Sequence, residues 1–252
     1  MSADSLWPAG VARHVLDTVD STNAHAARLA ANLSGPAWVL AAEQTLGRGR
    51  RGRPWVSPRG NFYASLLLRP QEPAERVALR SFVAALALRE ACVELTGLAV
   101  AFALKWPNDV LLNGGKLAGI LLESAGADGH VAHLVIGFGV NLIAAPDPGM
   151  VEVGALHPVS LLAETGLRVT PEAFLAALAP AYARWEAVFV AQGFAPVRAE
   201  WLRHAARLGQ PIRARTGTMT RSGIFETIDP QGALVLGTPS GRVTIAAAEV
   251  FF

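Results

Sequence analysis

Two groups of cationic residues in this chain could do chemistry on an anion. Four arginines and three glycines lie between Gly47 and Arg53, within the stretch EQTLGRGRRGRPW. Lysine occurs at only two of the 22 basic positions, Lys105 and Lys116, which lie eleven residues apart. Lysine is a compact cation with three donors and arginine is a planar fork, so the two are not interchangeable at a tight site. We therefore expect lysine to be chemically required at these two positions.

The arginine-rich stretch allows several interpretations. The string GRGRRG fits the G-x-G-x-x-G dinucleotide fingerprint, but that fingerprint needs a helix directly after the glycines, and RPWVSPRG is loop chemistry instead. Arginines also bind nucleic-acid phosphates and bases, yet one basic loop on a chain of net charge +2 is a poor electrostatic footprint. A solvated surface loop is the plainest alternative.

A lid that orders around an anionic ligand fits these residue types best. Glycines let backbone N–H groups approach a ligand closely, and arginines supply charge-assisted donors for phosphate. Four like charges repel one another, so we expect the empty loop to be mobile. A bound phosphoanhydride would offset this repulsion and order the loop. The residue types therefore indicate a site that closes over an activated phosphoanhydride.

The elements that must position these groups alternate between helices and strands. A helix is predicted from the capping residues 20–22 to Gly35, and another from 73 to 96 with Gly97 as its stop. Buried strands are predicted at 37–45 and 61–70. A β-meander follows, with turns at Asn113-Gly114 and Asp128-Gly129 and with strands near 101–105, 110–112, 117–123 and 131–137. Three helices come next, and the short β runs after Gly209 predict a small β-barrel.

Composition limits the class of protein. Hydrophobic residues make up 52% of the 252 residues, which is enough for a sizeable core, and 17% are charged. Cys92 is the single cysteine, so an intrachain disulfide and a cysteine zinc site are excluded. We find no leader-like N-terminus and no run of about 18 apolar residues, so we expect a cytoplasmic protein with no membrane span.

Four motifs together resemble those of biotin protein ligases. They are DSTN, EQTLGRGRRGRPW, KWPNDVLLNGGKLAGILLE and GFGVNL, in this order from Asp20 onward. The later PVSLLAETG and the C-terminal β runs are similar to that family as well. The resemblance implies an α+β fold in residues 1–208, with a mixed or antiparallel sheet and flanking helices like those of class II aminoacyl-tRNA synthetases. It implies a C-terminal SH3-like β-barrel in residues 209–252.

The resemblance also implies a two-step reaction. Biotin and ATP, with Mg²⁺, give biotinyl-5′-AMP and pyrophosphate; a lysine of a biotin carboxyl carrier protein, an acetyl-CoA carboxylase subunit or a related one, then attacks and AMP leaves. Only about twenty residues precede Asp20, so the chain resembles the ligase-only type without a DNA-binding winged helix. No DNA binding is expected, and a homodimer is plausible. A lipoate or octanoate ligase or transferase of the same architecture is the enzymatic alternative, and a nucleic-acid-binding module is the non-enzymatic one.

Site residues follow from the same resemblance, and it identifies no metal ligand. The predicted catalytic residues are Lys116, Arg50 and Asp109. The predicted biotin-binding residues are Ser21, Thr22, Asn23, Gln44, Arg48, Gly49, Arg50, Lys116 and Gly119. The predicted ATP-binding residues are Arg48, Arg50, Trp55, Lys105, Asn108, Lys116 and Asn141.

Lys116 is the main catalytic candidate on physical grounds. A biotin carboxylate and the α-phosphate of ATP repel each other, and a shared ammonium offsets that repulsion more in the transition state than in the ground state. A carboxylate is already a nucleophile, so the first step needs no general base. None of the six histidines falls within the four motifs, in agreement with this chemistry.

Overall fold

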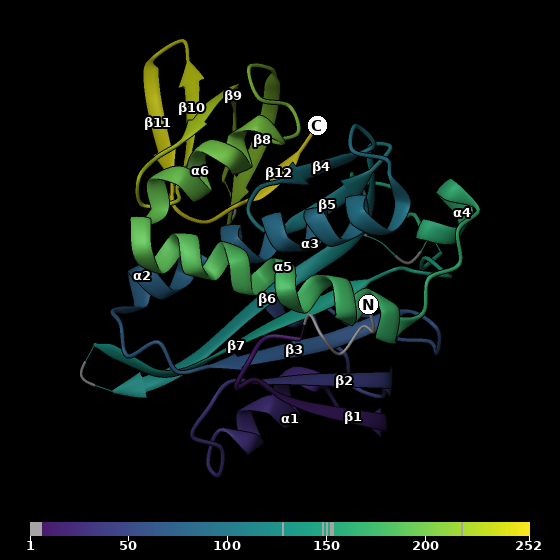
Figure 1. The fold of residues 1–252 in the computed structure, drawn as a ribbon. Coiled ribbons are helices and arrows are strands. Elements are labelled where there is room, and N and C mark those ends of the chain that lie inside the picture. The colour runs from purple at the N-terminus through teal and green to yellow at the C-terminus, as the bar shows by residue number, and fades with distance from the viewer. Residues whose placement is uncertain (1–6, 128, 148, 150, 152–153, 218) are drawn as a thin grey trace.

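The computed structural model describes residues 7–127, 129–147, 149, 151, 154–217 and 219–252, and these form a large mixed sheet and a smaller antiparallel one (Figure 1). The large sheet has the strand order β1-β2-β3-β7-β6-β5-β4. Its strands are β1 Ala12–Val19, β2 Ala37–Gln44, β3 Phe62–Leu68, β4 Phe102–Lys105, β5 Asp109–Leu112, β6 Gly115–Ala127 and β7 His130–Val140. Only the β1–β2 pair is parallel, and the other pairs of this sheet are antiparallel.

Side chains alternate between the two faces of the sheet and so divide the core in two. On β2, Trp38 and Leu40 belong to the main core together with the helices α3 (Arg80–Thr96) and α5 (Pro171–Gln192). Ala37 and Val39 point the opposite way and pack with α1 (Thr22–Leu29) in a separate cluster. Helix α1 is short, and the cavity described below lies beside it on this face.

Helix α5 belongs to the core. Its length and its 18-residue window of mean hydropathy 1.2 would suffice to cross a membrane, a feature that the sequence analysis did not find. It packs along α3, and its inward residues, among them Phe174, Leu178 and Tyr182, are buried. The apolar composition of α5 is therefore explained by its place over the sheet.

A smaller sheet completes the molecule at the C-terminal end of the chain (Figure 1). Its order is β11-β10-β9-β8-β12, from β8 Pro211–Thr216, β9 Met219–Ile228, β10 Leu234–Thr238, β11 Gly241–Ile245 and β12 Glu249–Phe251. Helix α6 (Phe194–Arg203) joins it to the rest: Arg198 donates to the Ile228 carbonyl and to Thr227 Oγ1. From the turn between β4 and β5, Trp106 donates its indole N–H to the Gly232 carbonyl at 3.0 Å.

The α+β class, the flanking helices, the β-meander β4–β7 and the small C-terminal β unit are confirmed. Several details of the sequence prediction are wrong. The edge strand β1 was not predicted; α1 ends at Leu29 rather than near Gly35; and the helix expected at 73–96 is two helices, α2 (Ala74–Ala78) and α3. The short helix α4 is Leu161–Thr165. Asp128 of the predicted second turn lies outside the described residues, as do residues 1–6, and the unit boundary near 208 stays a prediction.

Candidate active site

One cavity of about 400 Å³ collects the predicted site residues. It lies between the α1 face of the large sheet, the arginine loop and the end of β12. Each predicted residue contributes to its lining: Ser21, Thr22, Asn23, Gln44, Arg48, Gly49, Arg50, Trp55, Lys105, Asn108, Asp109, Lys116, Gly119 and Asn141. Four motifs that are far apart in the sequence therefore meet at one place, while their individual roles stay predictions.

Glycines on β7 line this cavity. Gly137 and Gly139 alternate with the core residues Ile136 and Phe138 and face the α1 side. A Cβ at Gly139 would lie 2.6 Å from the Trp55 indole, and a Cβ at Gly137 would lie 2.3 Å from Asn23 Oδ1. A side chain at either position would therefore force Asn23 or Trp55 to shift.

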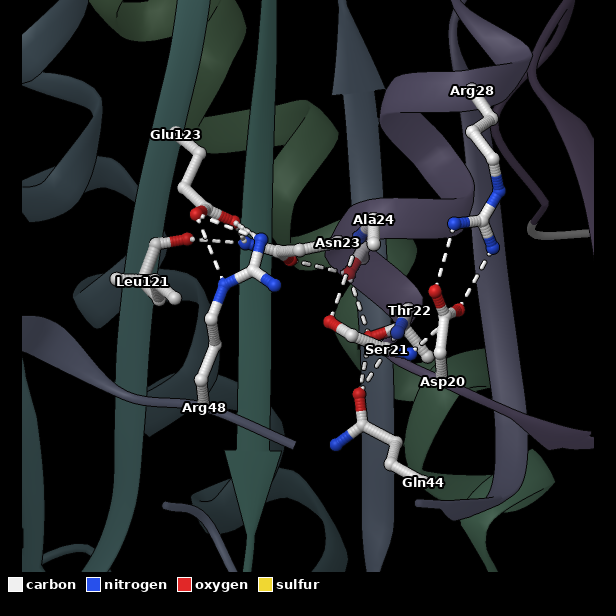
Figure 2. Close-up of polar contacts among 11 residues, drawn as sticks. Asp20, Ser21, Thr22, Asn23, Ala24, Arg28, Gln44, Arg48, Leu121 and Glu123 are labelled. Carbon is white, nitrogen blue, oxygen red and sulfur yellow. Dashed lines mark hydrogen bonds and ion pairs between the residues drawn. The ribbon is translucent and has the colours of Figure 1, made fainter. Parts of the chain in front are cut away.

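A hydrogen-bonded chain begins at the N-terminus of α1 (Figure 2). Gln44 Oε1 accepts from the Thr22 backbone N–H at 2.9 Å and lies 3.1 Å from Thr22 Oγ1. The other end of the same amide donates to Ser57 Oγ at 3.1 Å, and Ser57 donates to the Trp55 carbonyl at 2.8 Å. Ser21 caps the helix by accepting from the Ala24 N–H. The chain ties the helix start to the end of the arginine loop.

The same chain runs on in the opposite direction to β6 (Figure 2). Ser65 Oγ lies 2.8 Å from Thr22 Oγ1 and 2.6 Å from Asn23 Oδ1. Asn23 Nδ2 donates to Glu123 Oε2 at 2.7 Å, and Glu123 also pairs with Arg48 at 3.0 Å. Both ends of the chain thus reach the arginine loop, at Arg48 and at Trp55.

A buried carboxylate between two lysines forms the cationic centre of the cavity. Lys116 Nζ lies 2.8 Å from Asp109 Oδ1 and Lys105 Nζ lies 3.5 Å from Oδ2. Burial alone would raise the pKa of Asp109, but the two ammonium groups outweigh it and hold that pKa below its ordinary value. Burial lowers the pKa of Lys105, partly opposed by Asp109. Lys116 is one-third exposed and can reach a ligand in the cavity.

The arginine loop closes into a small turn above this centre. Residues 48 and 54 form an antiparallel bridge, and Gly49 donates to the Arg53 carbonyl at 2.7 Å. Arg50 points inward, with Nη1 3.4 Å from Asn108 Oδ1, while Asn108 donates to the Ile120 carbonyl at 2.6 Å. Burial lowers the pKa of Arg50 from its ordinary value, although a guanidinium remains charged at neutral pH.

The C-terminal sheet holds the outer side of the loop. Glu249 of β12 pairs with Arg51 at 3.3 Å, with Arg53 and with Arg215 of β8. Partial burial opposes ionisation of Glu249, but hydrogen bonds from Arg215 and Arg53 outweigh it and lower its pKa to about 2. Arg51 and Arg53 of the arginine loop therefore both have an acidic partner on β12. The mobility of the empty loop stays a prediction.

Asn141, which was predicted, donates to the Val159 carbonyl at 3.1 Å. Sequence reasoning missed several residues that line the cavity or support its walls. Glu123, Glu249, Ser57, Ser65, Gly137 and Gly139 were not proposed. A polar Ser65 within the apolar strand FYASLLL and the alternation GFG were available signals; nothing local marks Glu249. Among the described residues, no group of three or more His, Cys, Asp and Glu side chains could hold a metal ion.

Comparison with known proteins agrees with this architecture. Residues 15–141 match the Biotin/lipoate A/B protein ligase family, and residues 208–252 match the Biotin protein ligase C terminal domain. The fold and these two matches define the class of the protein as a ligase. The chain belongs to the Biotin/lipoate A/B protein ligase family.

Individual biotin ligases are similar to this chain over most of its length. The chain is 60% identical to a biotin--[acetyl-CoA-carboxylase] ligase of Paracoccus denitrificans, over 94% of this chain and 99% of that protein. It is 34% identical to the bifunctional ligase/repressor BirA of Escherichia coli, over 93% of this chain and 74% of that protein. The structure of the Aquifex aeolicus biotin protein ligase in complex with biotin and ATP superposes with a TM-score of 0.81 at 27% identity, over 95% of this chain and 98% of that one.

Proposed function

We propose that this protein joins biotin to ATP as biotinyl-5′-AMP and transfers the biotin to a lysine of a biotin carboxyl carrier protein. The observation that carries the proposal is that one cavity holds a polar corner at Thr22 and Gln44 and a cationic centre at Lys116. The 60% identical relative is a biotin--[acetyl-CoA-carboxylase] ligase, which supports the acetyl-CoA carboxylase carrier subunit as the acceptor.

Lys116 is proposed to bring the two reacting anions together. Its ammonium is held by Asp109 at 2.8 Å, so the side chain is preorganised before any ligand arrives. A biotin carboxylate and the α-phosphate of ATP can both approach this charge, and the stabilisation is greatest when negative charge accumulates in the transition state. Arg50, whose loop covers the same centre, is proposed to bind the phosphate from above.

The nucleotide is proposed to lie on the side of Trp55, Asn108 and Asn141. The Trp55 indole packs closely on β6 and β7, because a Cβ at Gly139 would lie 2.6 Å from it and a Cβ at Gly119 would lie 3.3 Å from it. Lys116 Nζ lies 5.8 Å from its ring centroid. Mg²⁺ enters this scheme as the complex of ATP, since its charge neutralises the phosphates that leave as pyrophosphate. Lys105 and Arg48 are proposed as further cations for these phosphates.

The polar corner favours biotin over lipoate, the enzymatic alternative. A cyclic urea carries N–H donors and a carbonyl acceptor, which match the hydroxyls and the amide of Ser21, Thr22 and Gln44. These three side chains line the cavity, and those of Ser21 and Thr22 are almost fully buried. A dithiolane ring offers no such groups and would leave buried polar atoms unpaired, which a site of this kind rejects strongly.

Four further parts of the proposal concern the localisation, the partners, the domain division and the oligomeric state of the enzyme. Action in the cytoplasm, the absence of DNA binding, and a division into units at 1–208 and 209–252 are retained from the sequence. A homodimer through an exposed edge strand of the large sheet is the fourth part. Its edges are β1 and β4, and Val15 on β1 is 55% exposed, so an edge-to-edge contact there has apolar surface available. Sedimentation with and without biotin and ATP tests that part.

Exchange of labelled pyrophosphate into ATP tests the first half-reaction without an acceptor. Exchange is expected with biotin and not with lipoate or octanoate. Pyrophosphate exchange with lipoate but not with biotin would show that lipoate, and not biotin, is the substrate. Exchange with no acid at all, or a salt-sensitive gel shift with DNA in its place, would overturn the assignment.

A further inference from the structure

We propose that Arg50 and Asp109 direct the acyl group of biotinyl-5′-AMP to the carrier protein, because they keep the enzyme's own cationic side chains from being acylated. Arg50 places a guanidinium where an amine would react. Asp109 is a positioning residue that holds Lys105 and Lys116. The inference rests on the proposed function, since it concerns which nitrogen the same intermediate acylates.

The reaction that must be avoided is the second half-reaction on the wrong nitrogen. The lone pair of a neutral amine attacks the acyl carbon of the mixed anhydride and forms a C–N bond. The bond from that carbon to the phosphate oxygen breaks, AMP leaves with the electron pair, and the amine proton passes to water. The product would be a biotinyl amide on the enzyme itself. An ammonium has no lone pair and cannot make this attack.

Cationic side chains surround any intermediate that is bound in the cavity. Those that line it are Arg48, Arg50, Arg53, Lys105 and Lys116, and both lysines of the chain are among them. Burial lowers the pKa of a lysine and so produces a nucleophilic amine, whereas a guanidinium stays charged in the same place. The identity of a cation therefore matters most where it is buried beside the reacting atoms.

Arg50 shows the advantage of arginine at such a place. It points inward, with Nη1 3.4 Å from Asn108 Oδ1, and burial lowers its pKa from the ordinary value. The guanidinium nevertheless remains charged at neutral pH. A lysine at position 50 would meet the same burial with an ordinary pKa about two units lower. Part of it would then be a free amine next to the anhydride.

The two lysines of the cavity share one carboxylate. Lys116 Nζ lies 2.8 Å from Asp109 Oδ1, and Lys105 Nζ lies 3.5 Å from Oδ2. Burial lowers the pKa of Lys105, and Asp109 opposes that shift. Without this carboxylate a larger share of Lys105 would be free amine, and Lys116 would lose the group that holds its Nζ in place. Asp109 therefore restrains both amines.

Synthetic biotinyl-5′-AMP tests the proposal without the first half-reaction. Each variant is incubated with this compound in the absence of a carrier protein, and serum albumin is added as a bystander that carries lysines. Peptide mapping by mass spectrometry locates the attached biotin and separates lysine labelling from labelling of the α-amino group. Each rate is divided by the rate for albumin, which corrects for adenylate that is free in solution.

Arg50→Lys and Arg242→Lys form a matched pair, since each adds one amine and keeps the charge. The Arg242 side chain is 78% exposed, pairs with Glu226 on the C-terminal sheet and lies outside the cavity lining. An amine held beside the anhydride reacts at a high effective concentration, so we expect position 50 to be labelled at least about tenfold faster than position 242. Equal rates at the two positions would overturn the role of Arg50.

Asp109→Asn keeps the size of the side chain and removes its charge. We expect labelling at Lys105 or Lys116 to rise at least about tenfold over the wild type, since each unit by which a pKa falls gives ten times more free amine. Urea unfolding shows whether this variant is folded. The wild type tests the same point independently of that variant. Labelling of Lys105 or Lys116 there as fast as position 50 in Arg50→Lys would overturn the role of Asp109.

Pyrophosphate exchange by the same wild-type preparation separates the two levels of the proposal. Exchange with biotin, together with equal labelling at positions 50 and 242, would overturn this inference and leave the proposed function standing. A wild type without exchange would instead overturn the proposed function.

Discussion

Replacing Lys116 by methionine removes the central charge of the cavity while keeping a side chain of similar length. The ammonium lies 2.8 Å from Asp109 Oδ1, where the gross attraction is about 6 kcal/mol at an effective dielectric constant near 20. Desolvation offsets part of this, and the exposed third of Lys116 is screened by water. Similar attractions to the biotin carboxylate and the α-phosphate are lost in the variant. We expect a fall of about 10²–10³ in the adenylation rate, typical of losing one preorganised charge-stabilising group.

The same substitution also leaves Asp109 with fewer partners. Its side chain is 9% exposed, and Lys105 at 3.5 Å remains as its second cation. Breaking a buried pair costs up to about 3–5 kcal/mol of unfolding free energy, and Lys105 should reduce that cost. Asparagine at 109 would leave the ammonium of Lys105, which is 11% exposed, without this carboxylate. The double variant Lys116→Met with Asp109→Asn should therefore recover neither stability in urea unfolding nor the rate.

Single-turnover formation of biotinyl-5′-AMP from labelled ATP, stopped by rapid quenching, measures the chemical step directly. Urea unfolding of the same preparations gives the stability. If the Lys116→Met variant formed the adenylate within threefold of the wild-type rate, Lys116 could not be the shared cation. Recovery of the rate in the double variant would likewise refute the reasoning, since the loss would then have come from the folding of the site.

Three further variants test other parts of the site. Arg50→Gly should speed dissociation of biotinyl-5′-AMP by about tenfold or more, because a charge-assisted bond is lost; an unchanged rate in a fluorescence chase would contradict the lid. Gly139→Ala places a Cβ 2.6 Å from the Trp55 indole, so it should raise KM for ATP and lower stability by about 1–3 kcal/mol, and normal values would show that Trp55 can move freely. Glu249→Gln should lower the free energy of unfolding by a constant amount above pH 4.5, the ordinary pKa of the group. The loss should become progressively smaller toward pH 2, where the wild-type carboxylate gains its proton. If acid unfolding curves show the same difference between wild type and variant at every pH, the contacts with Arg215 and Arg53 are not its source.

The strands and helices that sequence reasoning found are those with a strong periodic or turn signal. β3 and the meander β4–β7 are buried apolar runs bounded by recognisable turns. β1 has no such pattern: ARHVLDTV lies at the sheet edge, and only Val19 of it is buried. An edge strand with both faces partly solvated is specified by its pairing with β2, which no local pattern reveals.

The motifs bring the predicted residues to one place, but they do not reveal the contacts between motifs. All fourteen proposed residues line one cavity, and their individual roles stay predictions. The partners of the arginines are different. Arg48 meets Glu123 and Arg51 meets Glu249, which are 75 and 198 residues away in the chain. These ion pairs form only after the sheets have assembled. The sequence around a single acidic residue on a strand therefore does not predict them.

The contribution of β12 to the cavity has a consequence for the order in which a newly made enzyme matures. Glu249, Val250 and Phe251 supply one wall, and they are synthesised after every other element that surrounds the cavity. The strands of the large sheet can pair with one another on a ribosome before that wall exists. At that stage Glu249, which pairs with Arg51 and Arg53, has not yet been synthesised. The cavity of a nascent chain would thus gain its last wall only when β12 pairs with β8. Adenylation activity should therefore appear when the C-terminal sheet is complete.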